Sequence, residues 1–159
     1  MGLSTFEEEV VETIKKIFPD YVLEAKIQRE KRIAITVERE HIVEVARFLK
    51  ENFGFNHIAS VTGIDYLDKN EFKVVYHVWS INKRSLAALK TSIPGDNPHL
   101  PSLTPVWEGA IYHERETWEM FGIVFDGHPN LSRFLLPEDW DKGYPFRKEF
   151  KLRTTLESR

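Results

Sequence analysis

The residues best suited to chemistry lie in one stretch, residues 113–150. Glu114, Arg115 and Glu116 form a charged turn there, and His128 follows a little further along the chain. A carboxylate beside an imidazole can shift the pKa of both groups, which is what general acid–base catalysis needs. The stretch nevertheless contains no nucleophile on a tight turn, no glycine-rich phosphate loop and no positioned triad. We therefore interpret the charged turn as part of a helix and predict no catalytic residue.

The same stretch carries donor atoms that could bind a metal ion. His113, Asp126 and His128 have suitable side chains, but their spacing matches no known ligand pattern. His128 precedes Pro129, and the pair is better explained as a turn whose imidazole ring caps a backbone group. The sequence thus predicts neither a metal site nor a bound cofactor.

Three cations follow the charged turn: Arg133, Arg147 and Lys148. Together they could bind a phosphate group, or they could neutralise the acidic helix that precedes them. Guanidinium groups meet carboxylates with two parallel hydrogen bonds. We expect ion pairs within the chain and with neighbouring subunits.

Large aromatic side chains are frequent in this part of the chain, at Trp107, Trp118, Trp140, Tyr144 and Phe146. Aromatic residues and arginine are the anchors around which protein interfaces are built. The alternative is a satellite core beneath long loops, and we expect both. The segment 140–159 is the better interface candidate, because an extended segment buries little against itself. We expect it to be mobile in the isolated chain and ordered in a complex.

A helix must position the charged turn. The residues that share its apolar stripe on a helical wheel are Trp107, Ala110, Ile111, Thr117, Trp118 and Phe121. Gly122 ends the helix as a left-handed C-cap. Glu116 is expected on the far side, and Arg115 and Glu119 are expected to pair in solvent.

Glu114 falls in the middle of that apolar stripe. An unpaired charge there would be prohibitive. We therefore expect Glu114 to be buried and ionised against an arginine, with Arg133 and Arg147 as the candidates. Beyond the helix we expect a short strand at residues 123–125, loops, and an extended segment around Pro145.

The preceding elements alternate between helical and strand periodicity. A capping box at Ser4 predicts a first helix that ends before Pro19. Residues 21–27 and 32–37 predict a hairpin, and residues 42–53 a second helix closed by Gly54. Strands are predicted at 55–64, 72–80 and 86–93, followed by an irregular arm at 94–101. The order αββαβββα indicates a two-layer α+β domain, with helices on one face of a mainly antiparallel sheet and an extended C-terminal segment.

Composition limits the classes of protein that fit. The 159 residues predict a single domain, made of a globular part (1–106) and a part with the helix, loops and tail (107–159). A net charge of −3 argues against nucleic acid as a partner. No apolar run approaches the ~20 residues that cross a bilayer, so we expect no membrane insertion and a cytoplasmic chain. Without cysteine the chain cannot ligate an iron–sulfur cluster through thiolates.

The charged stretch resembles the signature of a known family, the thirty-kilodalton subunit of complex I. The matching residues are Glu114, Arg115, Glu116, Trp118, Met120, Phe121, Gly122, Phe125, Gly127, His128, Pro129, Leu131, Arg133, Leu135, Trp140, Gly143, Pro145, Arg147, Lys148 and Phe150. The resemblance is strong over residues 107–150, called here the signature segment. Over residues 1–106 it is general in layout.

This resemblance implies a non-catalytic accessory subunit in the peripheral arm of a complex I-like, ion-translocating oxidoreductase that passes electrons from NADH or ferredoxin to quinone. It implies docking on the large subunit, the hydrogenase-like subunit that helps to form the quinone site, beside iron–sulfur subunits and on the cytoplasmic side of the cell membrane. The residues that it marks as structural or interface residues are Glu114, Arg115, Glu116, Trp118, Phe121, Gly122, His128, Pro129, Arg133, Trp140, Pro145, Arg147 and Lys148.

Other assignments remain open. Related subunits occur in membrane-bound, energy-converting hydrogenases and in sulfur-reducing complexes. A small standalone enzyme using Glu114 and His128 is opposed by the missing nucleophile, and a nucleic-acid module by the negative net charge.

Overall fold

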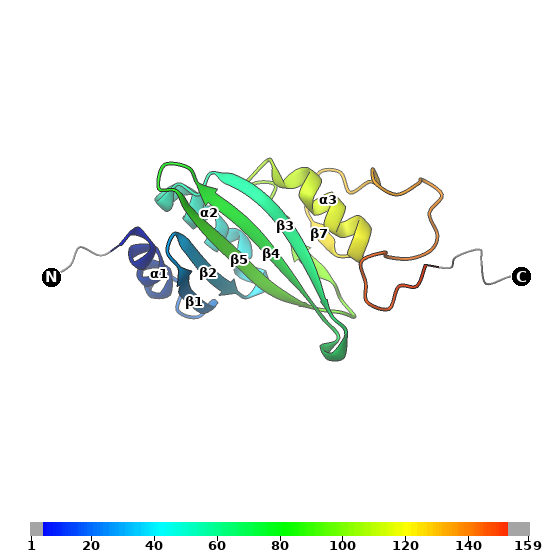
Figure 1. Ribbon diagram of the computed structural model, residues 1–159, viewed down its shortest axis with the longest axis horizontal. Coiled ribbons are helices and arrows are strands. Elements are labelled where there is room, and N and C mark those ends of the chain that lie inside the picture. The colour runs from blue at the N-terminus through cyan, green and yellow to red at the C-terminus, as the bar shows by residue number, and fades with distance from the viewer. Residues whose placement is uncertain (1–4, 153–159) are drawn as a thin grey trace, which may run out of the picture.

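The elements follow one another in the order that the sequence predicts, with one short strand added at residues 99–101. The computed structural model describes residues 5–152 (Figure 1). The helices are α1 (Phe6–Ile17), α2 (Ile42–Phe53) and α3 (Ala110–Phe121), with short 3-10 turns η1 (Arg39–His41) and η2 (Leu67–Lys69). The strands are β1 (Val22–Arg29), β2 (Arg32–Val37), β3 (His57–Tyr66), β4 (Glu71–Ser80), β5 (Ser85–Pro94), β6 (His99–Pro101) and β7 (Val124–Asp126).

The ends of the helices are set by local side-chain and backbone chemistry. At the start of α1 the capping box is formed by Thr5 and Glu8, which exchange hydrogen bonds of 2.8 and 3.2 Å. The box predicted from Ser4 is therefore displaced by one residue, and Ser4 itself lies outside the described residues. Gly54 and Gly122 end α2 and α3 in the left-handed conformation, with φ of 68° and 75°, as predicted.

Five strands form one sheet in the order β1-β2-β5-β4-β3. All neighbouring pairs are antiparallel except β2 and β5, which are parallel and are separated in the chain by α2, β3 and β4. Strand β3 begins at His57, later than the predicted residue 55. Phe55 instead takes part in the C-terminal cap of α2, where its N–H donates to the carbonyl of Leu49.

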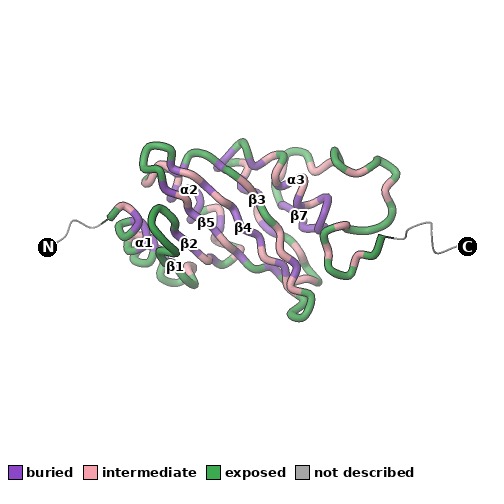
Figure 2. Tube along the Cα trace, viewed as in Figure 1, coloured by how far each residue is buried: buried purple, intermediate pink, exposed green. Residues whose placement is uncertain are grey.

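The hydrophobic core lies between one face of the sheet and the helices. Ile35, Leu89 and Tyr76 are adjacent across β2, β5 and β4, and all three are fully buried. Helices α1 and α2 contribute Val10, Ile14, Val45 and Leu49 to the same core. Figure 2 shows this alternation of buried and more exposed residues along the strands. The predicted two-layer arrangement, with helices on one face, is confirmed.

The arm predicted as irregular contains a strand. Residues 94–97 do turn, but His99–Pro101 forms β6 and pairs in parallel with β7. Sequence patterning missed β6 because two of the residues around it are prolines and its partner lies beyond α3. The two-stranded ribbon ties the arm to the signature segment.

The signature segment packs onto the core formed by residues 5–106. The indole N–H of Trp107 donates to the carbonyl of Phe55 at 2.8 Å, and the Lys50 ammonium donates to the carbonyl of Val106 at 2.6 Å. Trp107 precedes the helix, which begins at Ala110. Within residues 5–152, no helix combines the length and the apolar character that crossing a membrane requires.

Candidate functional site

Glu114 on α3 is fully buried, as predicted, but its partners are not arginines. Its carboxylate accepts hydrogen bonds from the Tyr76 hydroxyl at 2.9 Å, the Ser102 hydroxyl at 2.6 Å and the Leu103 N–H at 2.7 Å. The prediction of an Arg133 or Arg147 partner is therefore wrong. The helix turns Glu114 toward β4 and the turn after β6, and the loops that carry the arginines do not reach that side.

Burial and hydrogen bonding act in opposite directions on this carboxyl group. Burial raises the pKa of Glu114, while the bonds from Ser102, Leu103 and Tyr76 favour the charged form and offset part of that rise. The same burial, together with the charge of Glu114, raises the pKa of the Tyr76 hydroxyl. The group is thus a structural hydrogen-bonding centre that joins α3, β4 and the β6 arm.

Glu119 is also buried, against the prediction that it pairs with Arg115 in solvent. Its carboxylate accepts from the N–H groups of Leu135 and Leu136, at 3.1 and 2.6 Å, and more distantly from that of Phe134. The loop after β7 folds back over this side of α3 and covers it. A helical wheel cannot reveal this second buried side, because the covering loop comes from outside the helix.

Arg115 holds the same loop from the other end. Its guanidinium donates to the carbonyl and the hydroxyl of Ser132 at 3.0 and 2.9 Å. It also lies over the rings of Tyr112 and Phe134, at 5.6 and 4.8 Å from their centroids. The outcome is an ordered aromatic cluster on the surface of α3.

His128 caps backbone groups, as the sequence predicted. Its Nδ1 accepts from the N–H of Asn130 at 3.0 Å, so its Nε2 carries the proton and donates to the carbonyl of Ile111 at 2.9 Å. Asp126 pairs with His99 at 2.9 Å. Among residues 5–152, no three histidine or acidic side chains are grouped closely enough to hold a metal ion.

The three cations of the loops and tail bind backbone groups and rings. Arg133 donates to the carbonyls of Glu138 and Trp140. Arg147 donates to the carbonyl of Phe121 at 2.7 Å and lies over the ring of Tyr144, 4.4 Å from its centroid.

Within residues 5–152, these cations form no ion pair with the carboxylates of α3, so they do not neutralise the helix directly. Arg147 instead forms an ion pair with Glu149, a neighbour in the tail, at 3.7 Å. The Lys148 backbone N–H donates to Asp65 at the end of β3.

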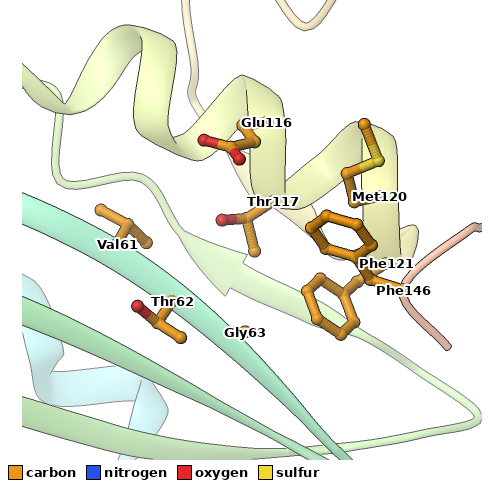
Figure 3. Close-up of a pocket in the computed structure, with 8 residues that line it drawn as sticks. All are labelled: Val61, Thr62, Gly63, Glu116, Thr117, Met120, Phe121 and Phe146. Atoms are coloured by element: carbon orange, nitrogen blue, oxygen red, sulfur yellow. The ribbon is translucent and has the colours of Figure 1, made fainter. Parts of the chain in front are cut away.

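A shallow groove of about 170 Å³ runs between α3, β3 and the tail (Figure 3). Met120, Phe121 and Phe146 form its apolar side. Gly63 permits the close approach of α3, because a Cβ there would lie 2.7 Å from the Phe121 ring. Glu116 lies at the groove and makes no hydrogen bond or ion pair with residues 5–152. The half-buried Trp118 packs against the core.

Reasoning from the sequence missed three partners at this site: Tyr76, Ser102 and the Leu103 N–H. One signal was available for Tyr76, because a tyrosine on the core-facing side of a strand needs a partner for its hydroxyl. No pattern identified Ser102 or Leu103, which lie in the arm that the sequence left without regular structure.

Comparison with known proteins agrees with this geometry. Residues 35–156 match the family model described as respiratory-chain NADH dehydrogenase, 30 Kd subunit. The matching subunit of the NADH-quinone oxidoreductase of Roseiflexus sp. (strain RS-1) is 45% identical over 90% of this chain and 83% of its own length. The matching subunit of the F(420)H(2) dehydrogenase of Methanosarcina mazei is 35% identical over 89% of this chain and 90% of its own.

Solved structures show the same fold. A chain of the membrane-bound sulfane sulfur reductase, an archaeal respiratory membrane complex, superposes with a TM-score of 0.82 and 29% identity over 91% of this chain and 85% of its own. A trypsin-resistant fragment of Nqo5 gives a TM-score of 0.68 at 30% identity, over 80% of this chain and all of the fragment. This chain therefore belongs to the family of 30 kDa subunits of the respiratory-chain NADH dehydrogenase.

Proposed function

We propose that this chain is a non-catalytic accessory subunit of a complex I-like membrane oxidoreductase, and that its signature segment docks on the large, hydrogenase-like subunit beside the iron–sulfur subunits. Its relatives are named as subunits of NADH-quinone, F(420)H(2) and sulfane sulfur enzymes, which supports membership in such an assembly. The chain then lies at the periphery of the membrane complex, on its cytoplasmic side. Its contribution to electron transfer is assembly.

The observation that carries the docking proposal is the exposed cluster on α3 and the loop after it. Tyr112, Phe134 and Leu135 are exposed by 64%, 45% and 50%, yet Arg115 and Glu119 hold the cluster in one conformation. Aromatic and aliphatic side chains that are ordered before binding cost little entropy to bury at an interface. Phe146 and Tyr144 of the tail are exposed as well.

Purification of the tagged chain from its own membranes tests the proposal. The large subunit and the iron–sulfur subunits should be recovered with it. In a chain with Phe134→Ala and Leu135→Ala, recovery of the large subunit should fall at least about tenfold, since each buried anchor contributes on the order of 1–2 kcal/mol.

The matched control is Leu67→Ala with Ile81→Ala, two exposed apolar residues outside the signature segment. The control should recover the complex as the unmodified chain does. Recovery of the unmodified chain without oxidoreductase subunits would contradict membership in the complex. Equal recovery by both double variants would place the docking surface elsewhere.

The same purification separates the alternatives. An NADH- or F(420)H(2)-linked enzyme and a sulfur reductase differ in the subunits that accompany the large subunit. The equivalent subunit of an energy-converting hydrogenase or sulfur reductase remains the second candidate, supported by the superposition on the sulfane sulfur reductase chain.

A further inference from the structure

The helices leave one whole face of the sheet uncovered in the view of Figure 1. The strand register shows which side chains share that face, because directly paired residues point to the same side. They lie in five rows across the strands: Arg29, Arg32, Leu86, Trp79 and His57; Lys26, Ala34, Ala88, His77 and Ser60; Glu24, Thr36, Lys90, Val75 and Thr62; Ser92, Lys73 and Ile64; and Pro94, Glu71 and Tyr66. These rows are called here the open sheet face.

The first row contains two arginines, and each of the next three contains one lysine. The acidic residues of the face are Glu24 and Glu71. Glu24 pairs with Lys26 at 2.8 Å and is also influenced by the charge of Lys90. Arg32, Lys73 and Lys90 take part in no ion pair with residues 5–152. This face is therefore cationic, although the chain as a whole carries a net charge of −3.

The centre of the open sheet face is apolar. Ala34, Ala88 and Val75 are 2–5% exposed although no helix covers them, because the longer side chains of neighbouring residues shield them. Burial and the charges of Arg32 and Lys90 lower the pKa of His77. Arg32 and Lys90 lie in the two rows that flank His77, and the half-buried Trp79 shares the row of Arg32.

We propose that the open sheet face binds an acidic segment of a neighbouring subunit, laid across the strands with its carboxylates on Arg32, Lys90 and Lys73. The proposal rests on the proposed function, since it assumes that the chain works inside a multisubunit complex. The pairing follows from charge complementarity, which directs association and fixes the position of a partner. The apolar centre and Trp79 provide apolar surface that the bound segment can bury, in addition to the charge contacts.

A protein segment fits this face better than nucleic acid does. Binding of a phosphate backbone is carried by many cations. The open sheet face has five lysine and arginine side chains, and Glu24 and Glu71 lie among them. An acidic peptide with apolar residues between its carboxylates matches both the rows of charge and the apolar centre.

The first test uses the full chain and short poly-L-glutamate as the probe. Arg32→Glu with Lys90→Glu should weaken binding about tenfold or more and remove its dependence on salt. The matched control is Lys16→Glu with Arg47→Glu, two exposed cations on α1 and α2 that give the same change in net charge. Equal weakening in both variants, or tighter binding of single-stranded DNA than of poly-L-glutamate, would overturn the proposal.

The second test uses the complex. The tagged Arg32→Glu, Lys90→Glu chain should recover its complex about tenfold less well than the control pair. Arg32→Gln with Lys90→Gln removes the two charges without reversing them, and it should give a smaller loss. This milder variant tests whether the loss comes from the charge rather than from misfolding. If the unmodified chain recovers the complex but the sheet-face variants match the control, this inference fails and the proposed function stands. If the unmodified chain recovers no oxidoreductase subunit, the proposed function itself fails.

Discussion

At the scale of single residues, helix α3 shows two ways of burying a carboxylate without a cation. Glu114 receives two hydroxyl groups and one backbone N–H, whereas Glu119 receives consecutive backbone N–H groups of one loop. Both replace the hydration that burial removes. Each carboxylate therefore holds a part of the chain that has no regular structure of its own.

Replacing Glu114 by alanine should lower the free energy of unfolding by about 3 kcal/mol or more, because Tyr76, Ser102 and Leu103 would each keep a buried donor without an acceptor. Glu116→Ala, on the same helix, should change it by less than about 0.5 kcal/mol. Urea unfolding of both variants measures the difference. Small and equal changes would show that water replaces the carboxylate at no cost.

The raised pKa of Glu114 predicts how stability depends on pH. The folded chain binds this proton more tightly than the unfolded chain, so the stabilisation is complete below the ordinary pKa of 4.5 and is lost as pH rises through the raised value. Glu114→Gln cannot titrate. The stability of the unmodified chain minus that of the variant should therefore fall with rising pH over this window and then level off. A difference that grows with pH would mean that the three donors outweigh burial.

At the scale of elements, Glu119 fixes the loop after β7 onto α3. Glu119→Ala should free the N–H groups of Leu135 and Leu136, and their hydrogen exchange should speed up at least about tenfold, the equivalent of 1.4 kcal/mol. Exchange at Tyr76 and other core strands should not change. The measurement is amide exchange resolved by NMR. Unchanged exchange at Leu135 and Leu136 would show that Arg115 and Ser132 suffice to hold the loop.

Gly122 joins the end of α3 to the tail. A Cβ there would lie 2.5 Å from the Tyr144 ring, whereas a Cβ at Gly127, which also has a positive φ, meets nothing within 4 Å. Gly127→Ala should therefore cost about 1 kcal/mol for the left-handed backbone alone.

Gly122→Ala should cost about 1–3 kcal/mol more than Gly127→Ala, through overpacking against the tail. It should also remove the protection of the Phe146 N–H, which donates to the carbonyl of Met120. Thermal or urea unfolding and amide exchange provide the two measurements. Equal costs for the two alanines would indicate that the tail moves aside freely.

At the scale of the whole molecule, we propose that residues 1–106 and 107–159 form a single folding unit from which the tail can be released. The two parts share one core, and residues 146–148 return to contact Met120, Phe121 and Asp65. The remaining described residues of the tail make few contacts with that core. Residues 153–159, the last part of the segment predicted to be mobile, lie outside the described residues.

Limited digestion with a broad-specificity protease tests whether the two parts form one folding unit and whether the tail can be released from it. In the free chain the first cuts should fall after residue 139, because extended backbone without ladder hydrogen bonds is accessible. The region around residues 94–109 should resist, since β6 and the Ser102 and Leu103 bonds secure it. In the complex the tail should be protected. Early cleavage near residue 106 would separate two domains, and equal resistance of the tail in both states would make it part of the core.

The sequence by itself determined the elements and their order. Helical periodicity with Gly54 and Gly122, strand alternation around Tyr76, and the turn at His128 are local properties, so each could be predicted from neighbouring residues. The motif of the signature segment also identified the family before any fold was known. These predictions succeeded because capping, turn chemistry and side-chain periodicity act over a few residues.

The tertiary structure alone decided which groups meet. A helical wheel placed Glu114 inside but could not supply Tyr76 and Ser102, which lie 38 and 12 residues away in the chain. It placed Glu119 outside because the loop that covers it follows the helix. The β6 strand likewise exists only through its pairing with β7. Partner choice for a buried charge depends on which segments the whole fold brings within hydrogen-bonding distance, and no local pattern encodes that distance.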